Sequence, residues 1–322
     1  MASSHCDLKL NIISMNVRGL RNAKKRRSLF RQFKTNNYDI IGLQETYLTN
    51  NDINLIKNEW GDNFHISEGT THSKGLLTLF GSSIKYDDAT IKTKNERCLI
   101  SKITIDKVNM CVANFYGPCN DNEKCSFLGK FKTTINRIYT DSPTDNLIVL
   151  GDFNIVMNNK VDIVSGQPHN PNIVKIFNDN INELLLNDIW RLNNGNIKDF
   201  TWSKKNPLLA RRLDYIFIDN DLLPFCVDSN IKTFGFSDHR AVTITLDFAS
   251  FKRGPGTFKF NTNLLHNIDF VNDVKKEILH INNMDLNPHI KWEYIKIQIK
   301  SLGMMYGRSL AIERSNKKKR TI

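Results

Sequence analysis

Ser237-Asp238-His239 stands just before the strand-like run 241–246, and this stretch is the strongest clue to the fold. An aspartate beside a histidine at a strand mouth can place a charge-stabilised imidazole against a reacting phosphate. Four more polar clusters each end an apolar run: Ser14-Met15-Asn16, Leu43-Gln44-Glu45-Thr46, Leu150-Gly151-Asp152-Phe153-Asn154 and Arg212-Leu213-Asp214-Tyr215. Five such clusters indicate strands that end at one shared site.

The hydrophobic pattern predicts an α/β protein. Strands are expected over 8–17, 38–45, 75–80, 99–105, 108–116, 146–150, 212–218 and 240–246. Helices are expected over 23–34, 123–139 and 172–186. Many short strands with a few helices between them predict two packed sheets flanked by helices, a layered α/β sandwich.

The chain divides into two predicted regions. Residues 1–246 are expected to form one large domain, and Lys252-Arg253-Gly254-Pro255-Gly256 then breaks the pattern. Residues 247–322 form a basic tail with helices expected over 268–281 and 291–312, ending in Lys317-Lys318-Lys319-Arg320. The net charge is +12, and 14 Lys/Arg against 7 Asp/Glu place +7 of it in the tail. Such a balance favours a polyanionic partner, most simply nucleic acid.

Composition excludes several classes of protein. A run of about 18 apolar residues is absent, so we expect no membrane span. The first seven residues lack an apolar signal segment, so we expect an intracellular protein. The six cysteines are scattered, without a Cys-x-x-Cys pair or a histidine at zinc spacing, and are interpreted as reduced thiols.

Phosphodiester hydrolysis requires a hard cation, an aligned water and stabilisation of developing negative charge. Glu45, at the end of a buried strand, is a candidate magnesium ligand, although a solvated strand-end glutamate would look the same. Asp152 and Asn154 are two apart on an expected extended segment and should point the same way. They could orient the water and the phosphate, or form an Asx-turn after the strand.

Three further residues complete the candidate set. Asp214 could keep His239 protonated and oriented, although a lone histidine is more often a surface or core residue. Asn16 could hold Glu45 or donate to the phosphate, or could simply form a turn at the end of its strand. Tyr116 could supply a phenolic hydroxyl, or could be a packed aromatic.

In order and approximate spacing, these motifs resemble the exonuclease–endonuclease–phosphatase superfamily. More narrowly, residues 8–246 resemble the apurinic/apyrimidinic-endonuclease-like domain of the polymerase-bearing protein of LINE-type, non-LTR retrotransposons. The resemblance implies a four-layered α/β sandwich, with a C-terminal helical extension in this chain. It also implies a site at the sheet edge and magnesium-dependent nicking of DNA.

The resemblance implies a metal site and an acid–base centre. Glu45 would be the metal ligand, with Asn16 and Asp238 beside it; Mg²⁺ is expected, and Mn²⁺ is expected to substitute for it. The residues implied to act on the phosphate and the water are Asp152 as the group that aligns or deprotonates the water, Asn154 and Asn16 as organisers of the phosphate and the metal site, Tyr116 as a phosphate contact, and Asp214 as the partner of His239.

The chain departs from the family pattern at two positions. Arg18 stands where some repair enzymes have an acidic residue, which puts a second metal position in doubt. Cys119 replaces an asparagine, and Asn120 follows it. A polar loop at 203–211 matches the place of the hairpin that enters a DNA groove in LINE domains. The residues expected to contact DNA are Arg18, Asn120, Trp202, Ser203, Lys204, Lys205, Arg211 and Arg212.

The expected function is nicking of one DNA strand to leave a 3′-hydroxyl that primes reverse transcription. The alternatives are an abasic-site repair endonuclease, a phosphatase for lipid or inositol phosphates, and an inactive nucleic-acid-binding remnant. The stretch 253–265 resembles the linker to a reverse transcriptase, but a Tyr/Phe-x-Asp-Asp motif is absent. We therefore expect the front part of a longer protein, monomeric and nuclear, that binds double-stranded DNA and, through the missing region, element RNA.

Overall fold

The computed structural model describes residues 8–82, 86–95, 97–105, 108–141, 145–204, 206, 208–248, 260–284 and 288–320. The chain forms two compact units, Met1–Phe251 and Lys252–Ile322. The first unit contains both β-sheets and the candidate site, and the second is helical.

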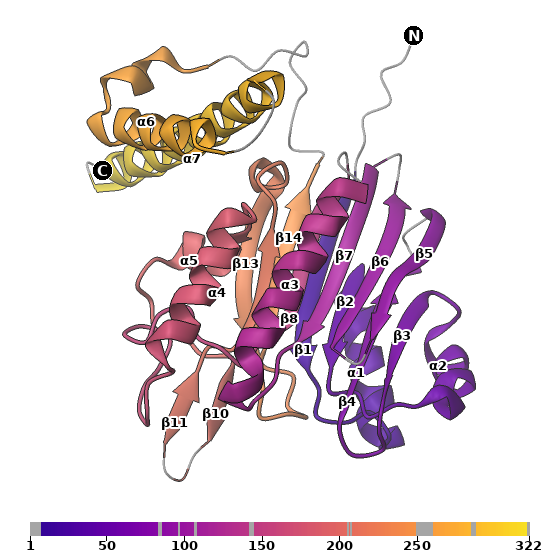
Figure 1. The fold of residues 1–322 in the computed structure, drawn as a ribbon. Helices are drawn as coiled ribbons and strands as arrows, with labels where there is room; N and C mark the ends of the chain where they lie inside the picture. Colours follow the sequence, from indigo (N-terminus) through magenta and orange to yellow (C-terminus); the bar gives the residue numbers. More distant parts are fainter. Residues whose placement is uncertain are drawn as a thin grey trace. The chain divides into compact units, whose positions relative to one another are not determined.

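Two six-stranded sheets form the first unit (Figure 1). Sheet A has the order β13 (Cys226–Lys232), β14 (Ala241–Asp247), β1 (Lys9–Asn16), β2 (Ile40–Gln44), β4 (Lys74–Phe80) and β3 (Phe64–Gly69). Sheet B has the order β5 (Tyr86–Asn95), β6 (Cys98–Ile105), β7 (Val108–Tyr116), β8 (Asn146–Asp152), β12 (Asp214–Ile218) and β9 (Asn187–Asp188). The pairs β1–β2 and β7–β8 are parallel and the other pairs are antiparallel, so both sheets are mixed.

Helices cover the outer faces of the sheets, and the predicted four-layered sandwich is confirmed. Residues of α1 (Ala23–Thr35) and α2 (Ile53–Trp60) pack on sheet A, and those of α3 (Asp121–Asp141) and α4 (Pro171–Glu183) pack on sheet B. Between the sheets lies a third apolar cluster that includes Ile12, Ile40 and Ile148. Because the central strands are buried on both faces, they are apolar almost throughout. The remaining short helices are α5 (Ile189–Asn194), η1 (Asn50–Asp52) and η2 (Leu223–Phe225).

All the strands of the two six-stranded sheets that the sequence pattern missed lie at sheet edges. In β13, Val227 is 49% exposed and the register with β14 shifts between Cys226 and Asp228. A strand with one neighbour and a bulge buries few side chains, so its sequence lacks the apolar run that marks a central strand. The strand expected over 212–218 begins at Asp214, since Arg212 and Leu213 precede the ladder.

A glycine sets the spacing between the sheets just below the edge where β2 and β8 end. Gly42 of β2 faces Leu150 of β8, and a Cβ atom at Gly42 would lie 1.9 Å from Leu150 Cδ1. A side chain here would require the buried Leu150 side chain to move in a close-packed layer. Each of these residues lies two positions before the last residue of its strand.

The second unit consists of η3 (Thr262–His266), α6 (Ile268–Asn282) and α7 (Pro288–Arg320), and confirms the predicted C-terminal helical extension. Leu264, Phe270 and Ile281 are buried. The rings of Phe270 and Tyr306 meet edge to face at 5.4 Å, which joins α6 to α7. Among the described residues, no helix combines the length and apolar character that a membrane crossing requires.

Candidate active site

Five strands bring their polar ends to one edge of the sandwich. Asn16 ends β1, and Glu45 directly follows β2, the parallel neighbour of β1 in sheet A. In sheet B, Tyr116 ends β7 opposite Asp152 of β8. Asp152 in turn lies opposite Asp214, the first residue of the antiparallel strand β12. Within each sheet, the strand register therefore places candidate residues side by side at the same edge.

Asn16 connects the two sheets. Its fully buried amide nitrogen donates to Glu45 Oε1 at 2.9 Å and to Asp152 Oδ2 at 2.8 Å. Its amide oxygen accepts from the backbone N–H of Arg18 at 3.0 Å. One side chain thus fixes the separation of two carboxylates that come from different sheets.

The Glu45 carboxylate is also held by two phenols. The hydroxyl of Tyr116 donates to Oε1 at 2.9 Å, and the hydroxyl of Tyr47 donates to Oε2 at 2.6 Å. Burial, followed by the hydrogen bond to Glu45, raises the pKa of Tyr47 to about 12, so it remains a donor at neutral pH. The sequence pattern does not identify Tyr47 as a site residue. Its position two residues after Glu45 is the feature of the sequence that places it near the candidate metal ligand.

His239 and Asp214 form an acid–base pair. The Nδ1 atom of His239 lies 2.9 Å from Asp214 Oδ2, and both side chains are buried. Burial alone would lower the pKa of His239, but Asp214, followed by Asp152 and Asp238, outweighs it and raises the pKa to about 9. The imidazole is therefore positively charged at neutral pH, with Nε2 as the nitrogen that can reach a substrate.

Asp152 is buried beside this pair. Burial, followed by the negative charge of Asp214, raises the pKa of the Asp152 carboxyl, while His239 opposes the shift. Its Oδ1 accepts from the backbone N–H of Asn154 at 2.9 Å. A carboxylate with a raised pKa is suited to take a proton from water.

The expectation of an extended segment from Asp152 to Asn154 is wrong, although the two side chains do meet, with Asn154 Nδ2 donating to Asp152 Oδ2 at 3.4 Å. Asn154 has φ +53°, a left-handed conformation that begins directly after the strand. The same amide nitrogen donates to the backbone oxygen of Gly117 at 3.0 Å, so the side chain bridges Asp152 and the loop that follows Tyr116. Asn154 therefore organises the Asp152 turn, and the Asx-turn interpretation describes it better.

Backbone strain is concentrated at this edge. Arg18, Glu45, Tyr47 and Asn154 all have φ between +43° and +56°, although none is glycine. Each such residue costs of order 1–3 kcal/mol and persists where the surroundings determine its conformation. Functional sites commonly accumulate this kind of strain.

The residues present fit a hard divalent cation. Asp152, Asp214 and His239 each offer an atom within 4.8 Å of the others, but His239 carries a proton and pairs with Asp214. A protonated imidazole is a poor ligand, so Glu45 is the better candidate. The buried Oδ1 of Asp214 has no hydrogen-bond partner within the described part of the chain, so one anionic oxygen at this edge is available to a cation.

Comparison with known proteins places this geometry in a family. Residues 13–239 match the Endonuclease/Exonuclease/phosphatase family. The chain belongs to this family. Its fold is that of a divalent-metal-dependent nuclease, and its chemistry is that of a phosphodiesterase-type hydrolase.

Two further comparisons give proteins that are similar to this chain in sequence or in fold. An uncharacterized 149 kDa protein of transposon TX1 from Xenopus laevis is 23% identical over 322 residues, which cover 96% of this chain and 24% of the relative. The chain thus spans about a quarter of that relative's length. An AP endonuclease from Leishmania major has a TM-score of 0.63 at 18% identity, covering 74% of this chain and 88% of its own.

A second solved structure is that of a protein described with another activity. The 3′ phosphatase NExo from Neisseria, bound to a product DNA hairpin, has a TM-score of 0.57 at 18% identity, covering 74% of this chain. At such identities the solved structures establish the fold alone. Together with the family match and the transposon relative, they confirm the resemblance to an AP-endonuclease-like domain of LINE-type elements.

In this family member the expected DNA-contacting loop is a hairpin. Its strands are β10 (Trp202–Lys204) and β11 (Leu209–Arg211), and it projects beyond the two sheets in Figure 1. Ser203 and Lys204 are exposed, and Leu208 is 59% exposed. Lys205 and Pro207 lie outside the described residues.

The base of the hairpin is less accessible. Arg211 is half-buried, and its Nη2 donates to the backbone oxygen of Gln167 at 2.9 Å. Its Nη1 lies 3.2 Å from His169 Nε2. Arg211 therefore holds the loop that carries Gln167 and His169 against the hairpin. Asn120 is exposed, and its side-chain oxygen accepts from the backbone N–H of Asn122 at the start of α3.

The expectation that Arg212 contacts DNA is wrong. Its side chain is 1% exposed and pairs with Asp162 at 2.8 Å and with Asp188 at 2.7 Å. The guanidinium also lies over the rings of Trp190 and Tyr215, with its carbon 5.3 Å and 4.5 Å from the ring centroids. Arg212 is a structural cation, and its buried charge is compensated within the protein.

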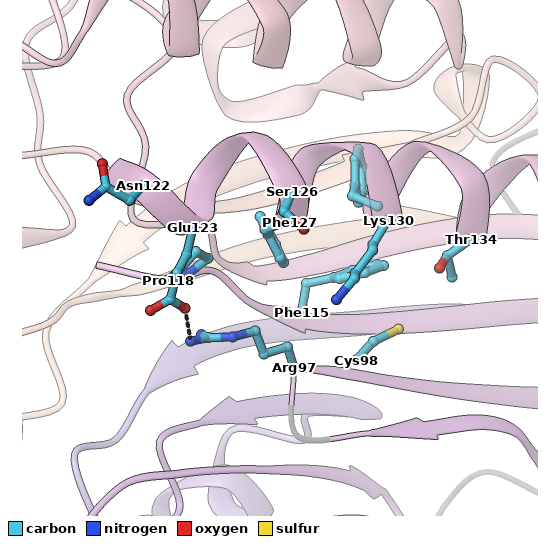
Figure 2. A pocket seen from close by; sticks show the side chains of 11 residues that line it. Arg97, Cys98, Phe115, Pro118, Asn122, Glu123, Ser126, Phe127, Lys130 and Thr134 are labelled. Carbon is cyan, nitrogen blue, oxygen red and sulfur yellow. Dashed lines mark hydrogen bonds and ion pairs between the residues drawn. The ribbon is translucent and has the colours of Figure 1, made fainter. Parts of the chain in front are cut away.

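A cavity of about 480 Å³ lies between α3 and the strands β6 and β7 (Figure 2). Arg97 lines it, pairs with Glu123 at 3.0 Å, and lies over the ring of Tyr116. Aromatic side chains such as Phe115 and Phe127 form part of the wall. Arg97 thus connects the cavity wall to Tyr116 of the candidate site, but the residues that line the cavity include none of the acid–base residues.

Proposed function

We propose that the protein is a magnesium-dependent DNA endonuclease. It would nick one strand and leave a 3′-hydroxyl that can prime reverse transcription. The observation that carries this proposal is the grouping of Asp152, Asp214 and a protonated His239 within 4.8 Å at a strained edge. The relation to a transposon protein supports the priming role.

The residues divide the hydrolysis between them. Asp152 takes a proton from the attacking water, whose oxygen forms a bond to phosphorus. His239 stabilises the negative charge on a non-bridging oxygen through Nε2–H, since its Nδ1 is committed to Asp214. The bond from phosphorus to O3′ breaks, and O3′ takes up a proton from solvent. The products are a 5′-phosphate and a 3′-hydroxyl.

Glu45 would hold the metal, because its carboxylate is oriented by Asn16, Tyr47 and Tyr116 and needs no rearrangement. A bound Mg²⁺ would supply Lewis-acid stabilisation of the phosphoryl charge, and Mn²⁺ would substitute. The substrate we propose is double-stranded DNA bound by a monomer in the nucleus. Element RNA would be bound by parts of a longer protein.

Supercoiled plasmid tests the proposal directly. The protein is incubated with plasmid in Mg²⁺ or in EDTA, and the nicked product is then offered to a DNA polymerase. We expect nicks only with the metal, and extension from those nicks without further processing. The AP-endonuclease fold favours abasic-site cleavage as a second candidate, so a duplex with one abasic site is assayed in parallel. Cleavage confined to that duplex would replace the first proposal with the second.

The hairpin is expected to select the target. Replacing residues 204–208 by a Gly/Ser loop of equal length spares the buried Ala210 and removes the exposed tip. Because the tip would read groove shape and not perform chemistry, the total nicking rate should change little while nick positions on a long duplex redistribute. Sequencing of nick ends measures this. An unchanged map would assign target choice to another part of the protein.

The basic tail is expected to add non-specific affinity for DNA. Deleting residues 252–322, the second unit, leaves β14 whole and removes 14 Lys/Arg and 6 Asp/Glu, a net charge of +8, so fewer counterions should be released on binding. The slope of log affinity against log salt should become shallower, while the rate of nicking by the bound enzyme is retained. Fluorescence anisotropy at several salt concentrations measures the slope. An equal slope in both proteins would exclude the tail from binding.

A further inference from the structure

Arg18 occupies a constrained position at the mouth of the candidate site. Its backbone has φ +43°, and its N–H donates to the oxygen of the Asn16 side chain at 3.0 Å. The next residue, Gly19, donates its N–H to the Glu45 backbone oxygen at 2.7 Å. The ammonium group of Lys25 donates to the backbone oxygens of Val17 and Arg18. The loop that carries Arg18 is therefore tied down from both sides.

The guanidinium of Arg18 is directed by Asp238. Arg18 Nη1 donates to Asp238 Oδ2 at 2.5 Å, while 56% of the Arg18 side chain stays accessible to solvent. Partial burial would lower the pKa of Arg18, but Asp238, Glu45 and Tyr47 outweigh it and raise the pKa. A fixed positive charge thus stands within electrostatic reach of Glu45 and remains open to a ligand.

Asp238 in turn connects Arg18 to the hairpin. The same oxygen, Oδ2, accepts from the indole N–H of Trp202 at 2.9 Å. The backbone N–H of Ser203 donates to the Asp238 backbone oxygen at 3.3 Å. The backbones of Trp202 and His239 form an isolated antiparallel β-bridge. Two donors on one carboxylate oxygen make Asp238 an anchor within the protein.

We propose that Arg18 binds the reacting phosphate and that Asp238 positions it, linking this phosphate contact to the groove-reading hairpin. Asp238 is then a positioning residue and not the metal ligand that the resemblance implied. The inference rests on the proposed function, since a phosphate must enter the site. Arg18 suits the task because a guanidinium forms two parallel hydrogen bonds to phosphate oxygens, and its charge does not titrate.

Chemical rescue tests the role of Arg18. Arg18→Ala should lower turnover by about 10- to 10²-fold, the range for a hydrogen bond to a charged group. Millimolar guanidinium chloride should restore part of the loss, because the free cation can enter the vacated space beside Asp238. Arg31→Ala, on the exposed face of α1, removes the same charge elsewhere and should have wild-type turnover. Absence of rescue by any guanidinium concentration below denaturing levels would overturn the phosphate contact.

Double substitution tests the role of Asp238. Asp238→Asn keeps an acceptor for Trp202 but removes the charge that directs Arg18. If Asp238 acts through Arg18, the variant carrying both Asp238→Asn and Arg18→Ala should be no slower than Arg18→Ala alone. Guanidinium should also rescue that double variant poorly. Multiplicative losses would show that Asp238 acts independently of Arg18 and would overturn the link.

A metal-binding measurement distinguishes a positioning role of Asp238 from a metal-ligand role, and it requires no activity assay. Binding of Mn²⁺ alone to each protein is followed by electron paramagnetic resonance. Asp238→Asn should bind Mn²⁺ with nearly wild-type affinity, whereas Glu45→Gln should bind it much more weakly. Equal losses in the two variants would make Asp238 a ligand and overturn the proposal. If wild-type protein binds Mn²⁺ but nicks no DNA, the proposed function fails while this assignment of Asp238 is still decided.

Discussion

Replacing Asp152 or Glu45 by alanine is expected to reduce nicking by about 10²-fold or more, the usual loss when preorganised stabilisation of transition-state charge is removed. Asp152→Ala removes the only group that the proposed mechanism assigns to deprotonate water. Glu45→Ala removes the carboxylate that Asn16, Tyr47 and Tyr116 orient. Nicking rates on supercoiled plasmid in excess protein measure both losses.

Controls distinguish lost chemistry from lost structure. Asp152 is buried, and its raised pKa shows that burial of this charge is unfavourable, so the alanine variant should remain folded. Circular dichroism and thermal unfolding check this. Asp62→Ala removes an exposed carboxylate and should nick at the wild-type rate. Wild-type nicking that persists in excess EDTA would contradict the role of Glu45.

Asp214→Asn is expected to lower turnover by about 10²-fold, the usual loss when stabilisation of transition-state charge, here by His239, is weakened. The His239 pKa of about 9 depends on the negative charge of Asp214. Wild-type activity that requires the imidazolium should be lost as the pH rises through about 9. In the variant burial is no longer opposed by Asp214, so this loss should begin at lower pH. Equal pH–rate profiles between about pH 6 and pH 9 would contradict the pairing.

The same pair gives a stability test with a defined sign. The folded-state pKa of His239 is raised above its ordinary value of 6.5. The pairing therefore contributes stability fully below about pH 6.5, and the contribution is lost as the pH rises through about 9. The difference in free energy of unfolding between wild type and Asp214→Asn should be larger at about pH 6 than at about pH 10. Urea unfolding at both pH values measures it, and a pH-independent difference would indicate that Asp214 acts only through packing.

The core of the fold could be predicted because the central strands are apolar on both faces. The run 108–116 corresponds to β7 at both ends, and the polar residues after the central strands mark the edge where the site lies. Parallel neighbours such as β1 and β2 end at one edge of a sheet, so Asn16 and Glu45 had to be close. Order along the chain and strand direction thus carried most of the site.

What the sequence could not supply was the direction of individual side chains near strand ends. Arg212 and Arg211 are adjacent cations in one motif, yet only Arg212 is enclosed by Asp162 and Asp188. Those carboxylates lie 50 and 24 residues before it along the chain, and no local pattern connects them. Left-handed conformations at Tyr47 and Asn154 are likewise set by tertiary contacts, because neither residue strongly requires φ above zero.

The absence of a side chain at Gly42 gives the catalytic edge a mechanical dependence that its polar residues do not reveal. Asn16 and Glu45 extend from one sheet and Asp152 and Asp214 from the other, so their separations depend on how closely β2 approaches β8. A single methyl group at Gly42 would clash with the Leu150 side chain. A related copy could thus keep every ionisable group and still carry a packing change directly beneath them. An assessment of whether a related sequence retains nicking activity should therefore compare the packing residues at positions 42 and 150 as well as the polar residues of the site.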